Sequence, residues 1–166
     1  KYPDTGKLQL FKIKLMAARG KQDEALSILE ANLPNYEKNA GFLFTYALMN
    51  LQGGRFDKAI TGADKLAVIF PEEAEVFNLK AGILIRQGKL VEAKENIERA
   101  LAVNPTLFPA KFNLAATESR LGNEARSAAL VEELLALSPQ HNETLMLKAF
   151  NLTKQGDVDN AKQIYL

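Results

Sequence analysis

Residues 74–107 read AEVFNLKAGILIRQGKLVEAKENIERALAVNPTL, and this stretch decides the fold. Apolar residues recur at three- and four-residue steps on both sides of Gly88, and no strand-like alternation competes with them. That spacing predicts two amphipathic helices. Gly88 favours a turn between them because glycine adopts positive φ at low cost, and Pro105 closes the unit because proline cannot continue a helix. The stretch therefore predicts a helix–turn–helix unit.

The same punctuation returns along the chain every 34 residues. The glycines on this grid are Gly20, Gly54, Gly88, Gly122 and Gly156. Two further grids hold small residues, which let helices approach closely: Ala47, Ala81, Ala115 and Ala149 on one, and Ala25, Ala59, Ala93 and Ala161, with Ser127, on the other. Prolines stand at Pro71, Pro105 and Pro139. Because half of the ten glycines share one register, the chain is a repeat array.

The register sets the expected organisation of the chain. Repeats fall at 6–39, 40–73, 74–107 and 108–141, with a partial repeat at 142–166 and the tail of a preceding repeat at 1–5. We expect a single array over residues 1–166. In the first repeat Pro34 comes early and Glu37 replaces the grid proline, which predicts a distorted connector. Neither end has the polar outer face of a terminal repeat, so we expect a segment of a longer array.

This pattern resembles the tetratricopeptide repeat. That family favours a large residue at repeat position 4, small residues at 8 and 20, an aromatic or aliphatic residue at 24, alanine at 27 and proline at 32. In residues 74–107 these are Phe77, Ala81, Ala93, Ile97, Ala100 and Pro105. The resemblance, closest to bacterial arrays, implies an all-α fold, a right-handed α-solenoid of helix–turn–helix repeats with period 34. Two departures are Ser127 in place of alanine and Glu118 at a usually aromatic position.

The resemblance also implies where a ligand binds. In such arrays the first helices line a concave surface, chiefly through repeat positions 2, 5, 9, 12 and 13. The groove residues predicted in this way are Leu10, Lys14, Phe44, Leu48, Leu51, Asn78, Ile85, Arg86, Phe112, Arg120, Met146, Phe150 and Lys154. They would form an apolar groove with a basic edge of Arg86, Arg120 and Lys154, suited to a segment with apolar anchors and acidic character. The alternative is that the phenylalanines pack between adjacent repeats.

Composition disfavours several kinds of chemistry. The 166-residue chain carries 21 basic and 20 acidic side chains, a net charge of +1, so no long-range field gathers nucleic acid or anionic lipid. It contains no cysteine, and His141 is its only histidine, expected to be solvent-exposed in a connector. We therefore expect no metal and no cofactor. The acidic pairs Glu72-Glu73 and Glu132-Glu133 do not support a catalytic dyad.

The sequence thus predicts a protein–protein interaction scaffold and not an enzyme. It would hold a protein or peptide segment in the groove, within a bacterial assembly, secretion or regulatory system. One alternative is a structural module whose surface makes homo-oligomers. An RNA-binding helical repeat is disfavoured by the 34-residue register and the near-neutral charge. No membrane insertion is expected in this segment, and the compartment stays open between cytoplasm and periplasm.

Overall fold

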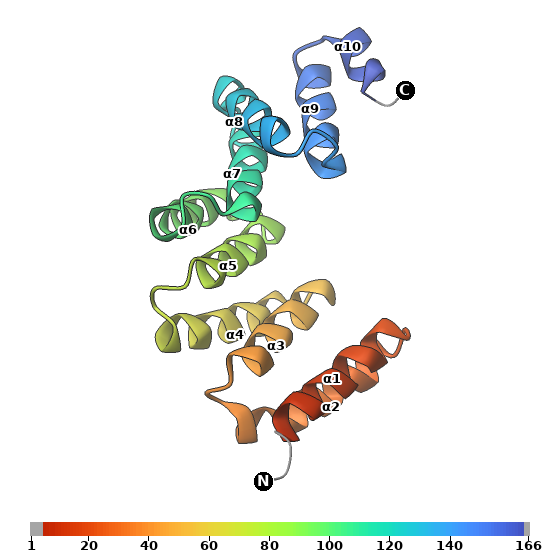
Figure 1. Ribbon diagram of the computed structural model, residues 1–166, viewed down its shortest axis with the longest axis vertical. Helices are drawn as coiled ribbons and strands as arrows, with labels where there is room; N and C mark the ends of the chain where they lie inside the picture. Colours follow the sequence, from red (N-terminus) through yellow and green to blue (C-terminus); the bar gives the residue numbers. More distant parts are fainter. Residues whose placement is uncertain (1–4, 165–166) are drawn as a thin grey trace. The chain divides into compact units, whose positions relative to one another are not determined.

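A computed structural model describes residues 5–164, in which all regular structure is helical (Figure 1). The helices are α1 (Thr5–Ala18), α2 (Gln22–Asn32), the 3-10 helix η1 (Leu33–Tyr36), α3 (Ala40–Gln52), α4 (Phe56–Ile69), α5 (Ala74–Arg86), α6 (Leu90–Val103), α7 (Phe108–Arg120), α8 (Glu124–Leu137), α9 (Asn142–Lys154) and α10 (Val158–Gln163). From α3 onward, the first helix of each repeat begins where the register places it. The all-α prediction is confirmed, and the helix order is that of an α-solenoid of helical repeats.

The glycine grid forms the turns within the repeats. All five glycines have positive φ, between 70° and 85°, and a Cβ atom added at any of them would meet nothing within 4 Å. Glycine is therefore needed for its backbone conformation and not to relieve crowding. The residue after the glycine then donates back to the ending helix, as the backbone N–H of Arg55 does to the carbonyl of Asn50 at 2.8 Å. That bond satisfies a carbonyl left free at the helix terminus.

The chain divides within α5 into two compact units, Lys1–Ile83 and Leu84–Leu166. The prediction of a single array over residues 1–166 stays a prediction. In the first unit α1 packs on α2, α2 on α3, and α3 on α4. One buried cluster of this unit comprises Leu43, Ala47, Ala59, Ala63, Leu66, Val76, Leu79 and Ile83. The helices α3 and α4 approach so closely that a Cβ atom at Gly62 would lie 3.1 Å from the Cβ of Ala47.

The connector of the first repeat is irregular, as the sequence predicts. Pro34 lies in η1, which continues directly from α2. The ring of Tyr36 stacks on that of Phe42 with centroids 3.9 Å apart. Asn39 then caps α3 by accepting from the backbone N–H of Phe42 at 3.2 Å. In this connector the 3-10 helix η1, and not a proline at position 37, forms the turn between α2 and α3.

In the second unit, a buried polar network joins the fourth and fifth repeats. The hydroxyl of Ser127 donates to the carbonyl of Ala115 at 2.8 Å and accepts from the Asn151 amide at 2.8 Å. The Ser119 hydroxyl donates to the Asn151 side-chain oxygen at 2.5 Å. Ser127 and Ser119 are almost fully buried, and Asn151 is 7% exposed. The departure from alanine at Ser127 therefore places a hydrogen-bonding group where three helices meet.

The second departure, Glu118, is a fully buried carboxylate on α7. Its oxygens lie 2.9 Å from Lys94 Nζ and 3.2 Å from Arg126 Nε, and one accepts from the Asn123 amide at 2.6 Å. Burial acts to raise the pKa of Glu118, but the Asn123 hydrogen bond and the charges of Lys94 and Arg126 outweigh it and lower the pKa below its usual value. Glu118 stands at a position that is usually aromatic, and its ion pairs and hydrogen bond link α6, α7 and α8.

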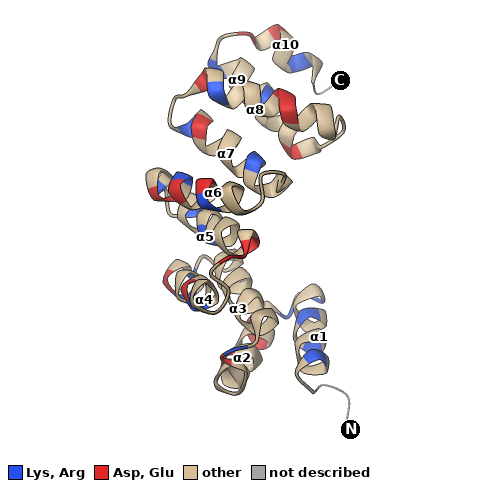
Figure 2. Cartoon of the chain, turned by 60° about the vertical axis from the view of Figure 1, so that its left-hand side comes forward, with Lys and Arg blue, Asp and Glu red and all other residues tan. Residues whose placement is uncertain are grey.

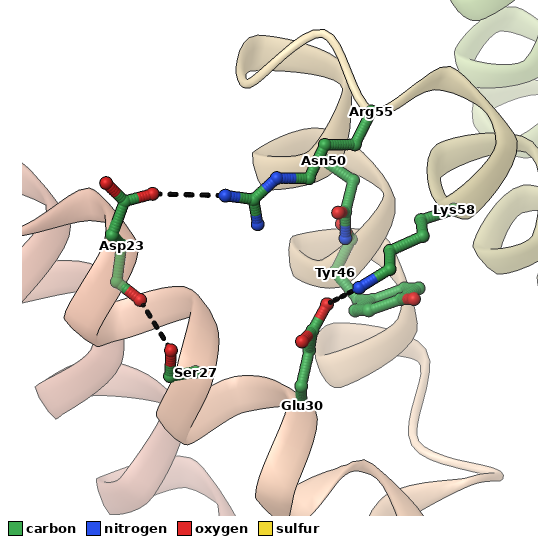
Figure 3. A network of polar contacts seen from close by, with 7 residues as sticks. All are labelled: Asp23, Ser27, Glu30, Tyr46, Asn50, Arg55 and Lys58. Carbon is green, nitrogen blue, oxygen red and sulfur yellow. Dashed lines mark hydrogen bonds and ion pairs between the residues drawn. The ribbon is translucent and has the colours of Figure 1, made fainter.

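Ion pairs also join consecutive repeats at their surface. An acid at repeat position 25 pairs with a cation of the next repeat: Glu30 with Lys58 at 2.7 Å, Asp64 with Lys80 at 2.6 Å, Glu98 with Arg126 at 3.9 Å and Glu132 with Lys148 at 2.8 Å. Figure 3 shows the first of these pairs beside a second one, in which Arg55 Nη2 lies 3.1 Å from Asp23 Oδ1. Exposed pairs add little stability singly, so they serve mainly to match neighbouring repeats.

Burial and, to a smaller extent, the Glu30 carboxylate raise the pKa of Tyr46, against a smaller opposing effect of Lys58. The phenol therefore stays protonated at neutral pH. In Figure 3 its ring lies next to the Glu30–Lys58 pair, and it covers that pair on the side of α3.

We predict that Ser127→Ala destabilises the chain by about 1–3 kcal/mol, because the buried Asn151 amide loses its acceptor. Ser27→Ala is the matched control, since Ser27 is exposed and bonds only to the Asp23 carbonyl of its own helix. That variant should change the free energy of unfolding by less than about 0.5 kcal/mol. Urea unfolding followed by circular dichroism measures both; equal losses would contradict the role of Ser127.

A pH dependence follows from Glu118. Its pKa is lower in the folded chain, so its stabilisation is complete above the unfolded pKa of about 4.3 and is lost as the pH falls through the lower folded value. We predict that Glu118→Gln lowers the free energy of unfolding by about 1.5–3 kcal/mol at neutral pH. The difference from the parent chain should shrink below about pH 4.3. Denaturation curves across that range measure it, and a difference that grows on acidification would contradict the assignment.

Candidate binding surface

The first unit contains a pocket of about 370 Å³ beside Phe44. Residues Lys14, Ala40, Gly41, Phe44, Thr45, Leu66, Phe70, Glu73, Glu75 and Val76 line it. The first helices α1, α3 and α5 each contribute to the lining, and Phe70 comes from the C-cap of α4. Phe44 remains 38% exposed. Its neighbour Thr45, in contrast, is buried and only 4% exposed. The pocket therefore offers an apolar surface to a ligand.

The rim of this pocket carries opposite charges. Lys14 lies on α1, whereas Glu73 precedes α5 and Glu75 lies in its first turn, where a carboxylate is favoured by the helix dipole. All three side chains are exposed, and none of them has an ion-pair partner within residues 5–164. The pocket can therefore hold an apolar side chain of a ligand. Its acidic rim can bind a basic group of that ligand, and Lys14 can bind an acidic group.

The other predicted groove residues of the first unit lie deeper. Leu10 packs at the edge of a buried cluster around Phe42, and its Cδ2 lies so near Gly41 that a Cβ atom there would be 2.9 Å away. Leu51 packs against the cluster of α3, α4 and α5, and Leu48 and Asn78 are half-buried. Of the groove residues predicted for this unit, Lys14 and Phe44 share the pocket, while the others contribute to packing or stand outside the lining.

In the second unit the predicted apolar residues divide into two kinds. Met146 and Phe150 are 58% and 51% exposed on α9, four residues apart and thus on one face of the helix. Phe112, in contrast, is half-buried against the core of α7 and α8. Its ring meets that of His141 edge-to-face with centroids 5.9 Å apart. For Phe112, the structure favours the packing alternative.

The expectation that His141 is solvent-exposed is wrong. The residue is half-buried, with its ring 4.8 Å from Phe108 between centroids, and it caps α9 by accepting on Nδ1 from the backbone N–H of Thr144 at 3.2 Å. His141 is thus the N-cap of α9, and two aromatic side chains of α7 contact its ring. Sequence periodicity does not reveal that contact, since it joins different helices.

Two members of the predicted basic edge donate to backbone carbonyls of the preceding repeat. Arg120 Nη1 lies 3.0 Å from the carbonyl of Ile85, and Lys154 Nζ lies 3.0 Å from that of Ser119. Both cations therefore help to cap the preceding first helix, where positive charge is favoured. Arg86 is exposed on α5. Lys154 Nζ also lies 3.6 Å from Glu124 Oε1, so Arg120 and Lys154 are already engaged within the array, and a basic edge to the groove stays a prediction.

The acidic and aromatic half of the pocket does not follow from the helical repeat positions. Glu73 and Phe70 lie in or next to the connector before α5, so helical periodicity does not select them. Their signal is positional: they flank Pro71 on the 34-residue grid, where the chain turns toward the next first helix. The acids at position 25, Glu30, Asp64, Glu98 and Glu132, form a further grid that is visible in the sequence.

Other kinds of site find no support in the part of the chain that the structure describes. Within residues 5–164, acidic and histidine side chains form no group that could hold a metal ion. Over the same residues, every helix is too short or too polar to cross a bilayer.

The paired helices, glycine turns and exposed first-helix pocket define a helical-repeat protein. Comparison with family models matches residues 74–107 to the tetratricopeptide repeat. This match supports the tetratricopeptide repeat family for this chain, and solved structures of tetratricopeptide repeat proteins share its fold. Proteins with this fold generally mediate protein–protein interactions, and they are typically scaffolds without enzymatic activity. Comparison with curated proteins gives no match.

Three solved structures illustrate the likeness. A thermophilic tetratricopeptide repeat protein of Thermus thermophilus, TTC0263, is 20% identical, covers 96% of this chain and 87% of its own, and has a TM-score of 0.82. PilW, a widely conserved type IV pilus biogenesis factor, is 20% identical over 98% of this chain and 77% of its own, with a TM-score of 0.87. MamA of Desulfovibrio magneticus RS-1 is 18% identical over 99% and 93%, with a TM-score of 0.79. At these identities the likeness establishes the fold.

The different burial of two groove phenylalanines gives a prediction. Phe112→Glu should lower the free energy of unfolding by about 2 kcal/mol or more, because a charge enters a half-buried site packed on α8 and His141. Phe44→Glu should cost less than about 1 kcal/mol, because its ring already meets solvent at the pocket. Thermal unfolding of the two variants measures the contrast. A larger loss for Phe44→Glu would contradict the exposed pocket.

Proposed function

We propose that the chain is a binding scaffold that captures a peptide segment at the Phe44 pocket. The observation that carries the proposal is the partly exposed Phe44 ring in a pocket of about 370 Å³ with an apolar lining and a charged rim. This volume lies within the range of about 300–1,000 Å³ that is usual for ligand pockets. An exposed aromatic ring supplies contact area that a ligand can cover at little cost in side-chain entropy.

The rim indicates the chemistry of the segment. Glu73 and Glu75 attract a basic side chain, and Lys14 attracts an acidic one. The preferred ligand is therefore an apolar side chain flanked by charges of opposite sign, with its basic group toward α5. This revises the sequence-based expectation of a mainly acidic segment, because Arg120 and Lys154 already donate to backbone carbonyls.

The setting is a bacterial assembly system. The likeness to PilW, described as a type IV pilus biogenesis factor, supports this part of the proposal, since a scaffold that holds peptide segments suits the ordering of other subunits. The setting is independent of the pocket, and the binding experiment tests the pocket alone.

The test uses peptides selected from a phage-displayed random library on the intact chain, then measured by fluorescence anisotropy. We expect selected peptides to pair an apolar residue with a basic one, and Phe44→Glu to weaken their binding at least about tenfold, since each 1.4 kcal/mol is a factor of ten. A double variant, Glu73→Lys with Glu75→Lys, should disfavour the basic peptides.

The matched control is Val68→Glu, which places the same charge on an apolar side chain of α4 that is 82% exposed and lines a different pocket, of about 480 Å³, outside the Phe44 pocket. Binding by this variant should equal that of the parent chain. Selection of no peptide, or equal loss in Phe44→Glu and Val68→Glu, would refute the pocket as the binding site.

A further inference from the structure

The helix α1 exposes a row of large apolar side chains. Leu8, Phe11 and Leu15 are 50%, 63% and 39% exposed. Their spacing of three and four residues puts them on one face of the helix. This face is separate from the Phe44 pocket, whose lining includes Lys14 of α1 but none of the three. Three neighbouring apolar side chains left in water call for a covering partner.

The later repeats show what covers the equivalent face. Repeat position 3, held by Leu8 in α1, is Phe42, Val76, Ala110 and Thr144 in α3, α5, α7 and α9, all 5% exposed or less. Position 10, held by Leu15, includes Ile83 and Thr117 at 0%. Phe42 packs with Leu26 and Leu29, which belong to the second helix of the preceding repeat. This face of a first helix is therefore the one that packs on the repeat before it.

The charges at the repeat junctions follow a rule. In the first four repeats, the acid at position 25 meets one cation of the next repeat, either at position 19, as for Lys58 and Arg126, or at position 7, as for Lys80 and Lys148. Where the cation stands at position 7, position 19 is not basic but holds Glu92 or Asn160. Each following repeat thus offers one cation to the acid before it.

The first repeat also offers one cation at a junction position, but no acid among the described residues pairs with that cation. Lys12 stands at position 7 and Glu24 at position 19. Lys12 is exposed, and within residues 5–164 no carboxylate pairs with it. Figure 2 shows α1 with basic residues and no acidic ones. An apolar row beside Lys12, which holds the junction position 7 and meets no described acid, is the half of a repeat junction that faces the preceding repeat.

We propose that the Leu8–Phe11–Leu15 face of α1 is a docking surface for a further helix pair of the same repeat type, joined in cis ahead of α1. The second helix of that pair carries a carboxylate at position 25 that pairs with Lys12. The apolar row supplies the contact area, and the carboxylate sets the register.

A second copy of the chain does not meet this requirement. The position-25 acids that the structure describes, Glu30, Asp64, Glu98 and Glu132, are already paired with cations of the repeats that follow them. Charge complementarity therefore selects an additional acidic helix pair over self-association.

The experiment adds such a pair to the intact chain. A copy of residues 40–68 is fused directly before Lys1, which continues the 34-residue register and brings the copied Asp64 to position 25. Hydrogen exchange should then show stronger protection of the amides of α1, and the Tm should rise by about 5 °C or more, as expected for one added repeat interface. A fusion with the copied Asp64 changed to Lys should lose about 1–3 °C of this gain. Lys12→Glu in that fusion should restore it.

Three outcomes would overturn the proposal. The first is unchanged protection of α1 in the fusion. The second is a rise in Tm that stays the same when the copied Asp64 is changed to Lys and when Lys12→Glu is added. The partner would then need no carboxylate. The third is concentration-dependent protection of α1 in the unfused chain, seen with light scattering of a dimer, which would make the occupant a second copy. Peptide binding at Phe44 is a separate readout and is expected to be unaffected in every fusion.

Discussion

The close contact between the two helices of one repeat is the constraint on which the rest of the structure depends. Alanines on both small-residue grids are almost fully buried, and Gly62 leaves no free room for a methyl group next to Ala47. At such a crossing, a larger side chain would move the helices apart. The turn glycines then bring the second helix back against the first, and the exposed face of the first helix remains available for binding.

Much of the fold could be predicted from the sequence because the constraint acts locally. A turn that requires positive φ favours glycine, and a close helix crossing favours a small side chain. Both residue types therefore recur at a fixed interval in the sequence. The glycine positions therefore predicted all five turns, and the missing proline at Glu37 predicted the irregular connector that η1 provides. Ser127 shows the limit: the sequence predicts a small residue there but not the hydrogen bond to Asn151, which lies on a different repeat.

The site was less predictable, because exposure depends on which neighbouring repeat covers a side chain. Phe44 and Phe112 occupy the same repeat position, yet one lines a pocket and the other packs on His141. The sequence predicts Lys154 as a groove residue, but in the structure its Nζ donates to the Ser119 carbonyl. In each case the contact that determines the side chain's exposure comes from another helix. The 34-residue pattern predicts which positions are equivalent, but not which contacts each side chain makes.

The charge rule at the junctions bears on how such an array can change in length. Since α2, α4, α6 and α8 each present an acid at position 25, and the repeat that follows each of them presents one cation within reach, the charge pairing at these four junctions needs no partner of unique sequence. A duplicated or deleted repeat would meet its new neighbour with matched charge at once. Tandem duplication could therefore lengthen the array without compensating substitutions, while buried networks such as that of Ser127 and Glu118 mark the places where a particular order of repeats has become fixed.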